Sequence, residues 1–70
     1  MSVARITEIK SSSSKSFEDA IQIGVARAAK TLRNIKSAWV GSQEVLVDEQ
    51  GRVTEYRVEM KVTFILEESD

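Results

Sequence analysis

The stretch Thr54 to Leu66 (TEYRVEMKVTFIL) alternates between apolar and polar side chains. Because successive side chains of a strand point to opposite faces, this alternation predicts a long strand with one buried face. The stretch contains no glycine or proline to interrupt it. The apolar side carries Tyr56, Val58, Met60, Val62, Phe64 and Leu66, and the polar side carries Glu55, Arg57, Glu59, Lys61 and Thr63.

The chain has only 70 residues, so we expect one domain, residues 1–70, with a modest core. Domains of this size often depend on disulfides, a metal ion or oligomerisation. The sequence has no cysteine, which excludes disulfides and thiolate metal sites. It has no histidine either, so the commonest general base and transition-metal ligand is missing. We therefore expect oligomerisation to supply stability, with an oxygen-bound cation as a further contribution.

The charge pattern narrows the classes of partner. The 10 basic and 11 acidic residues are interspersed, so the sequence contains no basic stripe of the kind that binds nucleic acid. No apolar run reaches the length of a transmembrane helix, and the N-terminus lacks the apolar segment of a signal peptide. We expect a cytoplasmic protein with no nucleic-acid or membrane partner. It is not expected to be an enzyme, because no nucleophile is paired with a base.

The first half of the chain predicts a strand followed by a helix. Val3 to Lys10 is rich in β-branched residues and predicts a strand. The serines at 11–14 are expected to form a connection. Ser16 is the expected N-cap of the helix, with Asp19 three residues later in a capping-box-like place. The apolar stripe of the helix recurs at spacings of three and four and is expected to run to Asn34–Ser37; it comprises Phe17, Ala20, Ile21, Gly24, Ala28, Leu32 and Ile35.

The second half predicts a β-hairpin. Ala38 to Val47 indicates a second strand, and Asp48 to Gly51 indicates a turn in which the glycine can supply a positive φ. The fold class is therefore α+β, with the order β-α-β-β. Gly24, between the small residues Ala20 and Ala28, predicts close packing of the helix. The charged face of the last strand is expected to meet other subunits in part, with a solvated face as the alternative.

Four segments resemble the dodecin family, and the likeness spans nearly the whole chain. They are ITEI, SFEDAI, ARAAKTLRNI and YRVEMKVTFILE. The last is the most specific, because it places an aromatic at Tyr56, alternating apolar residues, Phe64 and the pair Leu66-Glu67. The resemblance implies a hollow homododecamer, in which a three-stranded antiparallel sheet partly wraps the helix. It also implies storage of a small ligand rather than catalysis.

Typical dodecins bind flavins such as FMN or riboflavin as stacked pairs, through a tryptophan against the ring and a glutamine at its polar edge. Counted from Thr31 without gaps, the tryptophan's place is Ser37, and Trp39 follows two residues later. A shift of two keeps the same face of a strand, roughly 6–7 Å further along. Arg57 stands in the glutamine's place after Tyr56, and arginine donates hydrogen bonds but cannot accept them. The candidate ligand-binding residues are therefore Trp39, Ser37, Arg57 and Tyr56.

These departures leave two interpretations of the flavin site. In the first, which needs no gap and is preferred, the site is remodelled and flavin binding is weak or lost. In the second, a local two-residue insertion restores Trp39 to its role. Trp39 is then a stacking platform, or else a packing residue at a subunit interface. Arg57 contacts an anion, or else forms an ion pair with Glu55 or Glu59.

The resemblance is closer to a branch described as calcium-binding, which lacks the flavin pair. The segments SSSSKSFEDA and SAW carry this likeness. Calcium takes six to eight oxygen ligands, and one chain offers no complete cage. Copies related by symmetry are expected to complete it, with Glu18, Asp19 and Glu8 as candidate ligands. Ordinary capping and surface charge are the alternative for each residue, and a purely structural assembly module is the alternative to storage.

Overall fold

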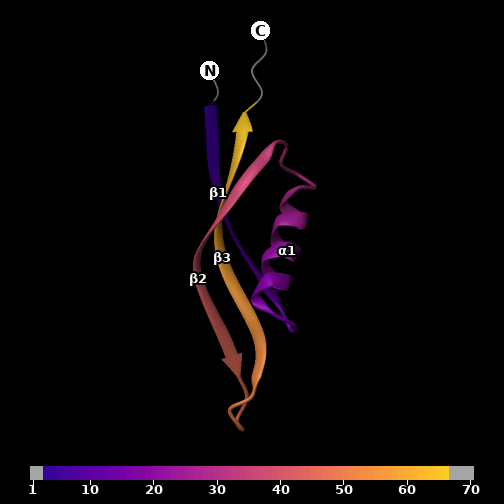
Figure 1. Ribbon diagram of the computed structural model, residues 1–70, viewed down its shortest axis with the longest axis vertical. Coiled ribbons are helices and arrows are strands. Elements are labelled where there is room, and N and C mark those ends of the chain that lie inside the picture. The colour runs from indigo at the N-terminus through magenta and orange to yellow at the C-terminus, as the bar shows by residue number, and fades with distance from the viewer. Residues whose placement is uncertain (1–2, 67–70) are drawn as a thin grey trace.

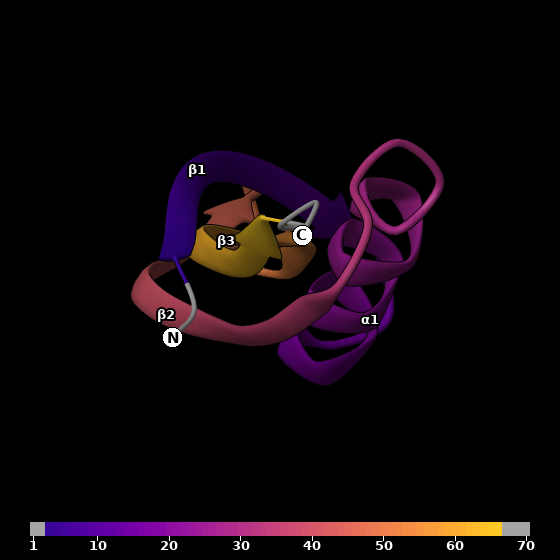
Figure 2. The same ribbon diagram turned by 90° about the horizontal axis from the view of Figure 1, so that it is seen from above.

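The computed structural model describes residues 3–66 and has the predicted order of elements (Figure 1). The strands form one antiparallel sheet in the order β1-β3-β2. The helix packs against β1 and β3, and the outer strands curve around β3 toward it (Figure 2). The α+β prediction is therefore confirmed. The elements are β1 (Val3–Ser13), α1 (Phe17–Ala28), β2 (Ile35–Val47) and β3 (Val53–Leu66).

The central strand β3 organises the core, as its alternation predicted. Val58, Met60 and Val62 are buried under α1, while the charged residues between them are exposed. Ala20 of the helix forms the innermost cluster with Val58 and Met60. Partly buried side chains pack around this cluster: Ile9, Phe17, Ile21, Val25, Ala38 and Val40. Glu67, the last residue of the family motif, lies outside the described residues.

The helix begins where predicted but ends earlier. Ser16 is the N-cap, and its Oγ accepts a hydrogen bond from the Asp19 N–H at 2.9 Å. The predicted extension to Asn34 is wrong, because α1 ends at Ala28. The next turn tightens, since the N–H of Thr31 donates to the carbonyl three residues back at 3.1 Å. Asn34 then reverses the chain at φ 61°, which lets β2 begin at residue 35 rather than 38.

Three residues of the serine run are not a connection, so the prediction for 11–14 is wrong except at Ser14. Residues 11–13 continue β1 and pair with residues 56–58 of β3. Ser11 Oγ donates a hydrogen bond to the carbonyl of Ala20, and Ser13 is only 7% exposed. Small polar side chains suit this place, because they let the helix backbone approach and satisfy its carbonyl.

Close packing of the helix at Gly24 is confirmed. A Cβ built on Gly24 would lie 2.7 Å from Met60 Cε and 2.7 Å from Ser11 Oγ. These separations are well inside van der Waals contact, so a side chain at this position would push α1 away from β1 and β3. Within residues 3–66, no helix combines the length and apolar character needed to cross a membrane.

The hairpin between β2 and β3 has the predicted turn at Asp48 to Gly51. Asp48 Oδ1 accepts hydrogen bonds from the N–H groups of Gln50 and Arg52, both at 2.9 Å. Gly51 has a φ of 79°, so the turn does require the positive φ that glycine supplies.

Replacing Gly51 by alanine is expected to lower the free energy of unfolding by about 1–2 kcal/mol, the cost of a left-handed conformation for a residue with a Cβ. Gly51→Asn is the matched control, because asparagine tolerates this conformation better. Urea denaturation at a fixed protomer concentration measures both variants. Equal losses for alanine and asparagine would contradict this account of the turn.

Candidate ligand-binding face

The face of the sheet that turns away from α1 carries three rows of aligned, exposed side chains; we call it the open face. The strand register places Lys61, Glu59 and Arg57 of β3 each between one residue of β1 and one of β2. The rows are Glu8–Lys61–Trp39, Lys10–Glu59–Ser42 and Ser12–Arg57–Glu44. Lys61, Glu59 and Arg57 therefore each lie directly opposite a charge of the other sign, which stabilises cross-strand pairing.

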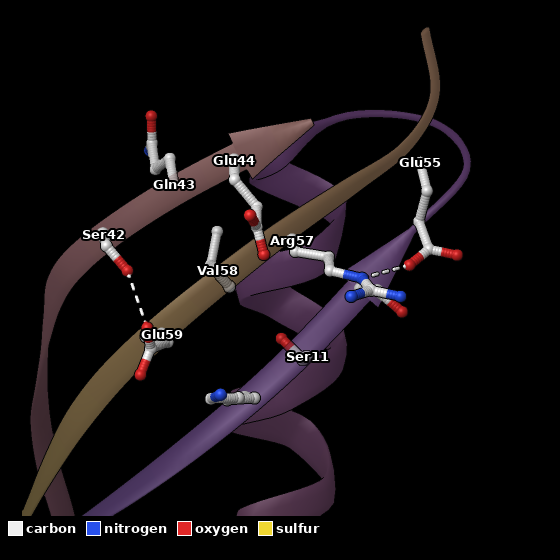
Figure 3. A pocket seen from close by; sticks show the side chains of 10 residues that line it. Ser11, Ser42, Gln43, Glu44, Glu55, Arg57, Val58 and Glu59 are labelled. Atoms are coloured by element: carbon white, nitrogen blue, oxygen red, sulfur yellow. Dashed lines mark hydrogen bonds and ion pairs between the residues drawn. The ribbon is translucent and has the colours of Figure 1, made fainter. Parts of the chain in front are cut away.

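A depression of about 480 Å³ lies on the open face beside the two rows nearest the hairpin (Figure 3). Ser42 Oγ donates a hydrogen bond to Glu59 at 3.0 Å, and Arg57 Nε donates one to Glu55. The depression brings Lys10 and Arg57 together with the carboxylates of Glu44, Glu55 and Glu59. Such a mixture suits a polar or charged ligand, since both signs of charge are available within one depression.

Arg57 forms the ion pair that was one of its two predicted roles. The hydrogen bond that Arg57 donates to Glu55 raises the pKa of Arg57 above its ordinary value, and the charges of Glu55 and then Glu44 act in the same direction. Both side chains of the pair are partly exposed, so it contributes little to stability. The pair does orient the guanidinium along β3. Contact of Arg57 with an anion stays a prediction.

Trp39 projects from β2 on the open face, and its side chain is 62% exposed. The Lys61 ammonium lies 5.5 Å from the centroid of its ring. A smaller depression of about 220 Å³ adjoins the ring and is lined by Glu8, Gly41 and Glu59 among others. Ser37 lies on the same face, in the row of Thr63. An exposed indole beside a cation can stack against a planar ligand.

The predicted flavin contacts do not all gather at one place on this chain. Ser37 and Trp39 are neighbours on the open face, whereas Arg57 lies four residues from Lys61 along β3, roughly 13 Å. Tyr56 turns to the helix side and packs edge-on against Phe17, with ring centroids 5.2 Å apart. Any ligand that touches both Trp39 and Tyr56 must therefore involve a second copy of the chain.

The candidate metal ligands also lie apart. Asp19 Oδ2 accepts a hydrogen bond from Ser13 Oγ at 2.6 Å, Glu18 is exposed in the first turn of α1, and Glu8 lies on the open face. Among residues 3–66, no group of three or more acidic side chains is arranged to hold a metal ion. Their roles as ligands stay predictions that require more than one copy.

Sequence reasoning missed two neighbours of Trp39. The alternation of the last strand assigns Lys61 only to its charged face, and no sequence pattern indicates a role for Gly41. Their proximity to the indole depends on how β2 and β3 are aligned, which includes an irregularity between Val40 and Ser42. Spacing within one strand does not reveal such an alignment.

Comparison with known proteins identifies the family. The sequence profile of the Dodecin family matches residues 3–67, nearly the whole chain. The chain belongs to the dodecin family. The resemblance inferred from the four sequence segments is thereby confirmed.

Individual dodecins show how far the similarity extends. Calcium dodecin of Mycobacterium tuberculosis is 36% identical over 64 residues, which is 91% of this chain and 89% of that protein. The tt0972 protein of Thermus thermophilus superimposes with a TM-score of 0.90 at 38% identity, covering 99% of this chain and 100% of that one. Dodecin from Streptomyces davaonensis superimposes with a TM-score of 0.89 at 31% identity, covering 96% and 97%.

Proposed function

We propose that this dodecin assembles as a hollow homododecamer that stores or sequesters a cation, with calcium as the first candidate, and does not transform it. The observation that carries the proposal is the 36% identity to a calcium dodecin over 91% of the chain. The acidic side chains that calcium prefers are present but scattered in one copy. The proposed site therefore lies where copies meet.

The chemistry of Arg57 does not fit the typical flavin contact. The polar edge of a flavin ring presents donors and acceptors together, and a glutamine amide matches both. Arg57 only donates, and Glu55 already accepts from its Nε. The open face also carries Glu8, Glu44 and Glu59, whose carboxylate oxygens are of the kind that calcium binds.

A second candidate function is binding of a planar aromatic molecule such as riboflavin, and the exposure of Trp39 supports it. An exposed indole gains apolar burial and an offset π contact when a flat ligand covers it, and Trp39 is 62% exposed. Storage rather than turnover is proposed here too, since no nucleophile–base pair was found in the sequence.

Native mass spectrometry of the protein, purified without chelator or flavin, tests both candidates. Twelve chains of 7.8 kDa predict a species near about 94 kDa. Additional mass in calcium-sized steps, lost with chelator and regained with added calcium, is the expected result. Steps of flavin size would favour the second candidate instead. A shell that takes up neither would overturn storage and leave a structural module.

Neutralising a calcium ligand is expected to lower calcium affinity by roughly 10–100-fold or more. Loss of a residue that only supports a ligand already costs a metal site that much. The variants are Asp19→Asn and Glu8→Gln, assayed by calcium titration of the intact assembly. Glu49→Gln is the matched control, because Glu49 is an exposed carboxylate in the hairpin turn. If all three variants bind calcium like the parent protein, neither Asp19 nor Glu8 is a ligand.

A further inference from the structure

The strand that carries Trp39 has a bulge two residues after it. Val40 lies opposite Met60 and Ser42 lies opposite Glu59, so Gly41 has no partner on β3. A bulge of this kind breaks the regular alternation and re-aims the neighbouring side chains. Trp39 and Ser42 consequently both reach the open face, although they are three residues apart.

The Trp39 indole lies against the backbone of Gly41. A Cβ built on Gly41 would be 2.8 Å from Cζ3 of Trp39, 3.4 Å from Cε3 and 3.5 Å from Cη2. Carbon atoms in favourable contact are about 3.5–4.0 Å apart, so a side chain at this position requires the six-membered ring to move. Only glycine leaves room for the ring in its present place.

Lys61 provides a second contact from the neighbouring strand. It lies directly opposite Trp39 in the register, with its ammonium 5.5 Å from the ring centroid. An exposed side chain ordinarily moves among several rotamers. Here the indole has neighbours on two strands, and 62% of the side chain is still exposed to meet a ligand.

We propose that Gly41 is a positioning residue, which seats the Trp39 indole so that the ring is held ready for a planar aromatic ligand. This inference rests on the second candidate function, the binding of an aromatic molecule. The bulge re-aims the side chains of β2, and the absence of a Cβ at Gly41 leaves space for the ring. Lys61 contacts the ring from β3.

The test is Gly41→Ala in the full-length assembled protein, with riboflavin as the probe. Cζ3 is at the far end of an exposed side chain, so the ring can move aside without disturbing the core. We expect unchanged assembly mass and far-ultraviolet circular dichroism. A crystal structure is expected to show the indole displaced. The dissociation constant for riboflavin is expected to rise about tenfold, a change that fluorescence titration resolves.

Trp39→Phe provides the matched background, because phenylalanine lacks the distant part of the indole. Adding Gly41→Ala to Trp39→Phe is expected to change riboflavin affinity by less than about twofold, as for sites that no longer interact. Lys36→Ala is the control on the same strand, since Lys36 is an exposed residue of β2 that lines neither depression.

The possible outcomes distinguish the placement of the ring by Gly41 from the binding of riboflavin. If the indole keeps its orientation in Gly41→Ala, Gly41 does not determine the position of the ring. A displaced indole with unchanged riboflavin affinity overturns the positioning role. If the parent protein binds no riboflavin, this inference fails together with the aromatic-ligand candidate, whereas calcium storage is unaffected.

Discussion

Met60→Ala is expected to lower the free energy of unfolding by about 2–5 kcal/mol, the range for removing a large side chain from a packed core. Met60 is 1% exposed at the middle of β3, and its Cε lies close beneath Gly24 of the helix. Truncation leaves a cavity between α1 and the sheet, and the rigid backbone at Gly24 limits how far the helix can close it. Urea denaturation at a fixed protomer concentration measures the loss.

Two controls show whether the loss comes from the cavity. Met60→Leu nearly conserves volume and is expected to cost less than about 1.5 kcal/mol. Glu59→Ala changes the adjacent residue of the same strand on the open face, where a surface substitution usually costs within about 0.5 kcal/mol. A Met60→Ala protein no less stable than Glu59→Ala would mean that α1 does not pack on β3 as described.

The sequence predicted those elements best whose pattern arises within a single strand or turn. The alternation of β3 follows from burial of one face only, and the turn at Gly51 follows from backbone sterics. Both signals are local and do not depend on what the rest of the chain does. The N-cap at Ser16 was predictable for the same reason.

Errors arose where tertiary packing overrode local pattern. Leu32 and Ile35 continue the helical spacing, yet the positive φ of Asn34 turns the chain and Ile35 pairs with Phe64 instead. Serines ordinarily indicate a connection, but Ser11 and Ser13 are recruited into β1 because their hydroxyls satisfy groups of the helix and its first turn. These partners belong to other elements, so composition alone does not indicate them.

The candidate site was predictable only in part for a similar reason. Alternation placed Ser37 and Trp39 on one face, and the register agrees. The contact of Trp39 with Gly41 arises from a bulge, and its contact with Lys61 arises from the pairing of two strands. The proposed calcium site is still harder to predict from one sequence, because its ligands would meet only when copies of the chain assemble.

Ile6→Lys is expected to abolish the species near about 94 kDa in native mass spectrometry, leaving smaller oligomers or monomers. Ile6 is 62% exposed on the open face, in the row adjacent to that of Trp39, which is equally exposed. Large apolar side chains exposed on a charged face are typical of an interface between proteins. In the proposed shell, a neighbouring copy covers Ile6.

The effect of this substitution on the stability of the assembly is multiplied, because every copy carries it. Burying an isoleucine contributes about 1.5–3 kcal/mol, and each copy loses that contribution while placing an unpaired charge in its contact. Ile6→Leu is the matched control and is expected to keep the full mass, since it preserves apolar area. If Ile6→Lys retained the mass of twelve chains, Ile6 would lie outside the contacts that close the shell. The exposed apolar residues at the hairpin, Val45, Val47 and Val53, would then be the next ones to test.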